Sequence, residues 1–258
     1  MHGYADLQDR TAIVTGASRG LGYAMAKGLR DAGCRVVCTA SQNLDALDHL
    51  SESHPESILA LRADVTEPDD CQRVVDMAMK RFGRLDILVN NAGRGMRTIS
   101  EKFMTEPVKF WQTDVYAWRR LIDTNVNGPY LMARSAVVPM LDAGWGRIIN
   151  ISMNYETMKR VGFSPYGPSK AALESETVIW AQDLHGTGVT VNSLLPGGAT
   201  RTGMIPSAMP DEVKMKLLEP EIIVPPLLYL CSAHSDGVTG RRFIATLWPG
   251  TEPAGWQP

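Results

Sequence analysis

The sequence is short of cysteine, of net charge and of long apolar runs, and each shortage argues against a class of protein. Four cysteines in 258 residues are too few for a disulfide framework. The 26 basic and 28 acidic side chains almost cancel, so there is no general attraction to nucleic acid or anionic lipid. No run approaches about 18 apolar residues, and the N-terminus lacks the basic-then-apolar order of a secretory signal. We therefore expect a cytoplasmic protein with neither a nucleic-acid nor a membrane partner.

Metal ligands are equally sparse. The five histidines are scattered and show no HExxH spacing. Cys34 and Cys38 lie close together, but they flank a strand-like run and no second Cys or His pair accompanies them. We expect no metal site and interpret these two thiols as small buried side chains of the core.

Strands and helices alternate along the chain. Apolar residues make up 44% and charged residues 21%, which is typical of a folded globular protein, and the length suits one large domain over 1–258. Near-continuous apolar runs, typical of strands buried on both faces, occupy 11–16, 34–40, 58–64, 85–93, 146–152, 189–197 and, less clearly, 241–247. Helical patterns occupy 20–32, 68–82, 115–142 and 166–185. The alternation predicts a single-domain Rossmann-type α/β fold, in which helices cover both faces of a doubly wound parallel sheet of about seven strands.

Two segments fit this alternation poorly. Residues 94–114 form a long connection, and residues 198–220 are rich in glycine, proline and methionine. Both follow the C-terminal end of a strand, where such sheets hold their ligands. We interpret 198–220 as a lid over a substrate.

The first strand runs into a glycine-rich turn that precedes a helix. Gly16, Gly20 and Gly22 suit a tight turn, close approach of the backbone to a pyrophosphate, and close packing of the helix on the sheet. The amides at the start of the helix then point at the anion. The strand before the turn and the helix after it give the motif the context that a dinucleotide site requires.

This TGxxxGxG spacing resembles the classical short-chain dehydrogenase/reductase family, and later segments match the family in the right order over residues 7–247. These segments are Asp64-Val65 after the third strand, Asn90-Asn91-Ala92-Gly93 after the fourth, Asn125 in DTNVNG, Tyr166-Gly167-Pro168-Ser169-Lys170, and Pro196-Gly197 followed by Thr202.

The resemblance implies an NAD(P)-dependent enzyme that moves a hydride between nicotinamide and a small alcohol or carbonyl substrate. It also implies a homodimer or homotetramer. The catalytic residues carried over are Tyr166, Lys170 and Asn125, with Ser152 next to the position of the family's serine. The cofactor-binding residues implied by the resemblance and by the glycine-rich turn are Gly16, Ser18, Arg19, Gly20, Leu21, Gly22, Ser41, Asp64, Val65, Asn91, Ala92, Gly93, Tyr166, Lys170, Pro196, Gly197 and Thr202.

Tyr166 and Lys170 lie four residues apart, so a helix presents both on one face. A free phenol ionises at about pH 10, too high for a base at neutral pH. We expect the neighbouring ammonium, with the positive nicotinamide ring, to lower that pKa, so that the phenol exchanges a proton with the substrate oxygen. By resemblance, Lys170 also binds the nicotinamide ribose, and Asn125 holds a water that links Lys170 to solvent.

One position departs from the family pattern. Members usually carry a serine thirteen residues before the tyrosine, but Met153 stands there and Ser152 precedes it. Met153 cannot donate a hydrogen bond to a carbonyl oxygen, and strand alternation turns Ser152 away unless the strand ends or bulges. Three interpretations stay open: the turn aims Ser152 inward, another donor such as Asn154, Tyr155 or a backbone amide replaces it, or the protein is a weak or inactive member.

The end of the second strand favours NADP over NAD. NAD-preferring members place an aspartate there, whereas this chain reads Cys38-Thr39-Ala40-Ser41-Gln42. Arg19 stands where NADP-preferring members often carry a base. We expect Arg19 to neutralise a 2′-phosphate, with Ser41 as a hydrogen-bond donor and Gln42 as a second candidate donor; a solvated Arg19 is the alternative.

The sequence gives no motif for the substrate-binding region. A set of apolar side chains either lines a pocket under a lid or only packs the long loops: Met96, Phe103, Met104, Phe110, Trp111, Met158, Phe163, Met204, Ile205 and Met209. Met153 also leaves a rival function open, a dinucleotide-binding sensor or regulatory protein on the same fold without turnover. The intact Tyr166, Lys170 and Asn125 favour the enzyme.

Overall fold

In the computed structural model, which describes residues 4–206, 212 and 215–248, seven parallel strands form one sheet in the order β3-β2-β1-β4-β5-β6-β7. The strands are β1 (Thr11–Val14), β2 (Arg35–Ala40), β3 (Ile58–Arg62), β4 (Ile87–Asn90), β5 (Gly146–Ile151), β6 (Val189–Leu195) and β7 (Arg242–Ile244). The predicted doubly wound parallel sheet is confirmed, and the seventh run, 241–247, supplies its edge strand.

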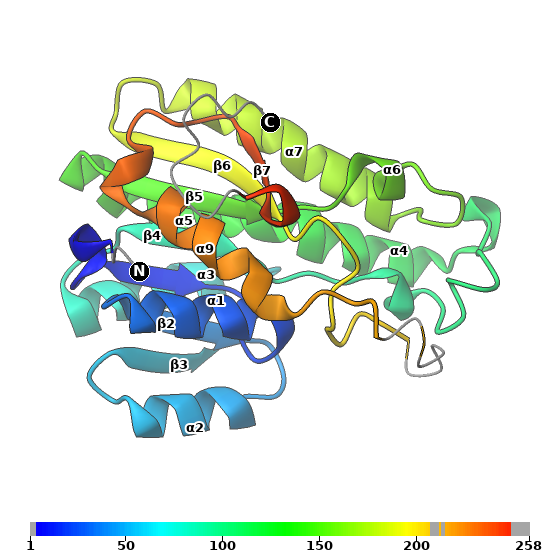
Figure 1. Ribbon diagram of the computed structural model, residues 1–258, viewed down its shortest axis with the longest axis horizontal. Coiled ribbons are helices and arrows are strands. Elements are labelled where there is room, and N and C mark those ends of the chain that lie inside the picture. Colours follow the sequence, from blue (N-terminus) through cyan, green and yellow to red (C-terminus); the bar gives the residue numbers. More distant parts are fainter. Residues whose placement is uncertain (1–3, 207–211, 213–214, 249–258) are drawn as a thin grey trace.

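Helices cover both faces of the sheet (Figure 1). The helices are α1 (Gly20–Asp31), α2 (Asp45–Ser53), α3 (Pro68–Phe82), α4 (Val115–Ile122), α5 (Gly128–Ala143), the one-turn α6 (Tyr155–Met158), α7 (Tyr166–Asp183) and α9 (Val224–Cys231). α1, α2 and α9 bury apolar side chains in one cluster, while α3, α5 and the end of α7 bury theirs in a second. Neighbouring strand residues alternate between the two layers, since Val14 belongs to the first cluster and Ile13 to the second. The sheet is therefore the middle of three layers.

The strand order reverses direction between β1 and β4. From β1 the chain winds outward to β2 and β3, and from β4 it winds the other way. The loops that leave β1 and β4 therefore diverge, and a crevice opens at the C-terminal ends of these strands.

Two helical predictions need correction. The pattern over 115–142 predicted one helix, but α4 and α5 are separated by a π-helical turn at Asp123–Asn127. α2 and α9 were not predicted. α9 has two prolines in its first turn and buries most of its residues, so it shows no polar face from which a helical period could be recognised.

The four cysteines are free and buried, and the Cys34 thiol donates to the carbonyl of Leu7. In the part of the chain that the structure describes, no helix is long and apolar enough to cross a membrane. Within the same residues, no three His, Cys, Asp or Glu side chains are grouped to hold a metal ion.

Candidate functional site

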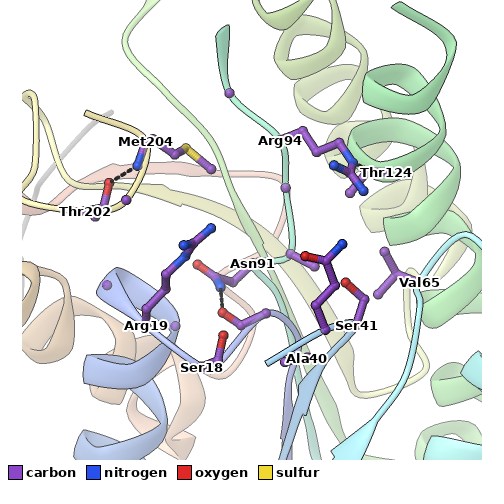
Figure 2. Close-up of a pocket in the computed structure, with 18 of the residues that line it drawn as sticks. Ser18, Arg19, Ala40, Ser41, Val65, Asn91, Arg94, Thr124, Thr202 and Met204 are labelled. Carbon is purple, nitrogen blue, oxygen red and sulfur yellow. Dashed lines mark hydrogen bonds between the residues drawn. The ribbon is translucent and has the colours of Figure 1, made fainter. Parts of the chain in front are cut away.

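A cavity of about 650 Å³ opens at the C-terminal ends of β1, β2 and β4, within the size range of ligand pockets. Figure 2 shows Ser18 and Arg19 on one side, Ser41 and Val65 on the other, and Asn91 between them. The predicted cofactor residues that line it are Gly16, Ser18, Arg19, Gly20, Leu21, Gly22, Ser41, Asp64, Val65, Asn91, Ala92, Gly93 and Thr202. The structure thus brings most of the predicted set to one place.

The glycine-rich turn has no room for side chains. Gly16 has φ +64°, and a Cβ there would lie 2.8 Å from the Cα of Ala92. A Cβ on Gly22 would lie 2.4 Å from the Asn91 Nδ2 and equally close to the Gly16 carbonyl oxygen. Glycine at both positions lets the turn after β1 pack directly on the turn after β4.

Hydrogen bonds lock these two turns together. The Asn91 amide nitrogen Nδ2 donates to the carbonyl oxygens of Thr15 (2.8 Å) and Gly16 (3.0 Å). In return, the Thr15 hydroxyl accepts from the backbone N–H groups of Asn91 and Ala92, both at 3.0 Å. This fixes the turn after β1 at the N-terminus of α1, the geometry that suits an anion at the helix start.

The 202–204 segment lines the cavity and contacts two separate parts of its wall. On one side, Thr202 packs on Gly20, where an added Cβ would lie 3.0 Å from the threonine methyl. The guanidinium of Arg19 packs on Gly203, where an added Cβ would lie 3.1 Å from Cζ. On the far side, Met204 covers Gly95.

Arg97 fastens the 202–204 segment. Its Nη1 donates to the Gly203 carbonyl oxygen at 2.8 Å, and its Nε faces both carboxylate oxygens of Glu101 at 2.8 Å. Arg97 and Glu101 both line the cavity. Arg97 is therefore held in the cavity wall by its contacts with Gly203 and Glu101.

The β2 end of the cavity is polar and carries no acid. Ser41, Gln42 and Asn43 are exposed there and line the cavity, as does Arg19. The next carboxylate along the chain, Asp45, accepts from the Asn43 side chain at 2.9 Å in the first turn of α2 and does not line the cavity. The loop after β2 therefore offers donors to an added phosphate, and the carboxylates that line the cavity, Asp64 and Glu101, come from other loops.

Tyr166 and Lys170 occupy the first turns of α7, beside the end of β5. Lys170 is buried, and its Nζ donates to the Ile151 carbonyl oxygen at 2.7 Å. Burial lowers the pKa of Lys170 to about 8, against the opposing effect of the Glu174 carboxylate. Burial also raises the pKa of Tyr166 to about 12. The effect of burial on the phenol pKa therefore opposes the lowering expected from Lys170 and the nicotinamide ring, because Tyr166 packs against apolar side chains.

Asn125 lies in the π-helical turn with 0% exposure. Its Oδ1 accepts from the Arg94 N–H (2.8 Å), and its Nδ2 donates to the Arg94 carbonyl (2.9 Å) and the Ser169 hydroxyl (3.0 Å). Ser169 in turn donates to the Tyr166 carbonyl at 2.7 Å. The Asn125 side chain therefore ties the segment after β4 to the first turn of α7.

The strand that precedes the methionine ends at Ile151, so strand alternation does not extend to Ser152 and Met153. Ser152 is 5% exposed, and its hydroxyl has no hydrogen-bond partner among the residues described.

Met153 belongs to a buried apolar cluster on which Tyr166 packs. The structure therefore places Met153, and not a hydroxyl, in the tyrosine's apolar surroundings. The cluster consists of Met96, Phe103, Met153, Met158 and Phe163.

The predicted residues on the substrate side of the site do not line the cavity. Those outside its wall are Tyr166, Lys170, Asn125, Ser152, Pro196 and Gly197. Phe110 and Trp111, for which either pocket lining or loop packing was expected, are each 69% exposed and do not line the cavity. Met209 lies outside the described residues.

The sequence analysis did not predict several residues of the cavity wall that follow the turn after β4 or directly precede Asn125. Their position just beyond the C-terminal end of a strand, where such sheets bind ligands, is the feature from which they could have been predicted. They are Arg94, Gly95, Arg97, Thr98, Glu101 and Thr124. The wall also includes Thr39, Ala40, Asn43, Ala63 and Gly203, and Met204 from the predicted pocket set.

A glycine-rich turn after β1, locked to the turn after β4 at the reversal point of a seven-stranded parallel sheet, defines the Rossmann class of proteins. Comparison with known sequences narrows the class. The profile of the short chain dehydrogenase family matches residues 10–213. A short-chain type dehydrogenase/reductase of Picea abies is 34% identical, over 91% of this chain and 90% of its own. D-beta-hydroxybutyrate dehydrogenase of Rhizobium meliloti is 31% identical, over 83% of this chain and 81% of its own.

Two solved structures of similar fold also come from this family or carry names of its enzymes. A putative short-chain alcohol dehydrogenase from Sinorhizobium meliloti superposes with a TM-score of 0.81 at 30% identity, covering 94% of this chain and 96% of that one. The 3-ketoacyl-(acyl-carrier-protein) reductase from Brucella melitensis, complexed with NADH, gives 0.80 at 27% identity, covering 92% and 96%. The chain belongs to the short-chain dehydrogenase/reductase family, whose members are NAD(P)-dependent oxidoreductases of small molecules. The predicted family is confirmed.

Proposed function

We propose that the protein interconverts an alcohol and the corresponding carbonyl compound with NADP(H) as the preferred cofactor and Tyr166 as the acid–base group. Family membership supports an oxidoreductase that acts on a CH–OH group. The observation that carries the finer proposal is the arrangement of Tyr166 and Lys170 on α7. It sets a phenol and a buried amine beside the end of β5 and ties them through Ser169 to Asn125.

The cavity fits a dinucleotide, since Gly16 and Gly22 leave room only for a backbone-lined cradle at the start of α1. Ser18 and the amides of Gly20 and Leu21 would hold the pyrophosphate, and Asp64 with Val65 the adenine. When bound, a nicotinamide dinucleotide supplies a hydride acceptor for oxidation or a hydride donor for reduction. Arg19 and Ser41 would hold the 2′-phosphate that distinguishes NADP.

Tyr166 exchanges the proton with the substrate oxygen. Because its pKa is about 12, the phenol stays protonated at neutral pH and can donate to a carbonyl oxygen during reduction. Lys170, with a pKa of about 8, is largely charged at neutral pH and favours the phenolate that results. Asn125 keeps the first turn of α7 in place through Ser169 and, by family resemblance, supports the water relay that restores the proton.

Ser152 is our candidate to polarise the substrate oxygen. Its hydroxyl is buried and has no partner within the described residues, so it is available to donate a hydrogen bond to a substrate oxygen. Asn154 is the second candidate, but its side chain already donates to the Gly197 carbonyl at 3.1 Å. Tyr155 is 48% exposed and lies under the guanidinium of Arg242.

The substrate carbon skeleton is apolar where it meets Tyr166. The five buried residues around the phenol are three methionines and two phenylalanines. Methionine side chains are flexible and adapt to the shape of an apolar ligand. We therefore propose a cyclic or aromatic ketone, or its alcohol, as the substrate class, in preference to a polyol.

The test is NADPH oxidation with cyclohexanone, acetophenone and, as a polar comparison, dihydroxyacetone. We expect turnover of the first two, and its loss in Tyr166→Phe with cofactor affinity nearly intact. Tyr155→Phe removes a nearby exposed hydroxyl and is the matched control. Activity retained by Tyr166→Phe would contradict the assignment of the acid–base group.

A dinucleotide-binding protein without turnover is the second candidate. The specific observations that favour it are Met153 among the apolar neighbours of Tyr166 and the absence of Tyr166 from the cavity wall. Under this alternative, NADPH binds, no carbonyl compound is reduced, and Met153→Ser does not create activity.

A cytoplasmic homodimer or homotetramer completes the proposal. Apolar side chains exposed on α5 and α7 support self-association; these are Tyr130, Val138, Leu141, Val178 and Ile179. Light scattering of the purified protein tests the oligomeric state.

A further inference from the structure

Arg242, the first residue of β7, connects three parts of the molecule. Its side chain is 13% exposed. The Nε lies 3.1 Å from Glu174 Oε1 on α7, and the Nη2 donates to the Met153 carbonyl oxygen at 2.8 Å. Its Cζ lies 4.0 Å from the ring centroid of Tyr155 at the start of α6. One guanidinium therefore joins β7, α7 and the turn that follows β5.

Glu174 completes the pair. It lies one helical turn after Lys170 and is also 13% exposed. Its second oxygen, Oε2, accepts from the Ser193 hydroxyl at 3.1 Å, and Ser193 pairs with Arg242 in the sheet. Its charge also acts on Lys170, where it opposes the effect of burial on the pKa. The carboxylate is thus held on the catalytic face of α7 by β6 and β7.

The turn after β5 carries the groups that face the substrate oxygen in the proposed function. It holds Ser152, whose backbone N–H donates to the Leu194 carbonyl at 2.9 Å, and Asn154, which donates to Gly197. Between them stands the Met153 carbonyl, the point at which Arg242 holds the turn. A guanidinium can make both contacts at once because its donors are spread over a rigid fork, whereas an ammonium offers one compact donor group.

We propose that the Arg242–Glu174 pair is a positioning device. It fixes the turn after β5 against α7, so that the donor on the turn and the acid–base pair on the helix face the same substrate oxygen. Neither residue touches substrate or cofactor. The inference rests on the proposed function, since it assigns to the pair the alignment of that site's two halves.

Arg242→Lys tests it, because lysine keeps the charge beside Glu174 but cannot fork to Met153. We expect kcat for the best ketone of the panel to fall about tenfold or more, since a charged hydrogen bond that aligns the donor is lost. KM, NADPH affinity and the unfolding midpoint should stay close to wild type. Arg241→Lys, at the neighbouring exposed arginine, is the control and should leave kcat unchanged.

Glu174→Gln provides an independent variant, since glutamine keeps the size and the bond from Ser193. It should also lower kcat with little effect on KM. Wild-type kcat in both variants would overturn the positioning role, as would a loss of kcat matched by equal losses of cofactor affinity and stability. Should Arg242→Lys not fold, Glu174→Gln alone decides. If Tyr166→Phe kept its activity, or no ketone were reduced by wild type, the proposed function itself would fail and this inference with it.

Discussion

Replacing Lys170 with methionine should change how folding stability depends on pH. Lys170 is 5% exposed, and burial lowers its pKa from 10.5 to about 8. Between these two pH values the unfolded chain holds a proton that the folded protein has released. Because the unfolded state binds more protons there, the free energy of unfolding of the wild type rises with pH. Below about pH 8 both states are protonated, and the cost of burying the ammonium is fully present.

The size of this effect follows from the pKa difference. A difference of about 2.5 pH units corresponds to about 3 kcal/mol at about 1.36 kcal/mol per unit. Methionine has a similar length and binds no proton, so it removes the linkage. The difference in unfolding free energy between wild type and Lys170→Met should therefore move in favour of wild type by about 3 kcal/mol between about pH 7 and pH 10.5.

Urea denaturation of both proteins across this pH range measures the difference. Lys80→Met, which removes an exposed lysine of α3, is the matched control and should show a much smaller pH dependence. If the Lys170→Met and wild-type curves ran parallel from about pH 7 to pH 10.5, the buried, deprotonating lysine would be refuted. That result would also remove the reason for linking Lys170 to the proton transfer.

Three further predictions concern the nucleotide cavity. Arg19→Ala should weaken NADP(H) more than NAD(H) by about 1.5–3 kcal/mol, as measured by isothermal titration of both cofactors; equal losses would refute the phosphate contact. Gly22→Ala, whose Cβ would meet Asn91 Nδ2 at 2.4 Å, should cost about 1–3 kcal/mol of stability and weaken both cofactors, and an unchanged unfolding midpoint would contradict the packing. Arg97→Ala removes the bond to Gly203 and should speed NADPH dissociation about two- to tenfold in stopped-flow fluorescence, whereas an unchanged rate would mean that this bond does not retain the cofactor.

The sheet and the cavity at its C-terminal edge could be predicted from sequence because their signals are local. Apolar strands, the glycines at 16, 20 and 22, and the turn at 90–93 each lie within a few residues, and parallel topology then brings their ends together. α9 escaped prediction for the opposite reason. Its first turn holds two prolines and most of its residues are buried, so it lacks the alternation of faces by which a helix is recognised.

The substrate half could not be predicted because it depends on contacts between distant residues. Arg242 and the Met153 carbonyl are 89 positions apart, and no pattern in the sequence links them. The sequence did show that Met153 replaces the usual serine, but the direction of its side chain depends on where β5 ends and on which apolar side chains surround Tyr166. The rise in the phenol pKa has the same origin, since it reflects the packing around Tyr166 rather than its spacing from Lys170.

The bonds between Asn91, Thr15 and Gly16 have a consequence for affinity. They form within the protein alone, so the glycine-rich turn is held in place before any ligand arrives, and a dinucleotide bound there as proposed would cost little conformational entropy in this turn. The side chains at the rim, Arg19 and Arg97, are held separately, by their contacts with the 202–204 segment. Under the proposed function, discrimination between the two coenzymes would then lie in other residues than recognition of their shared diphosphate, and a change at the rim would alter one without disturbing the other.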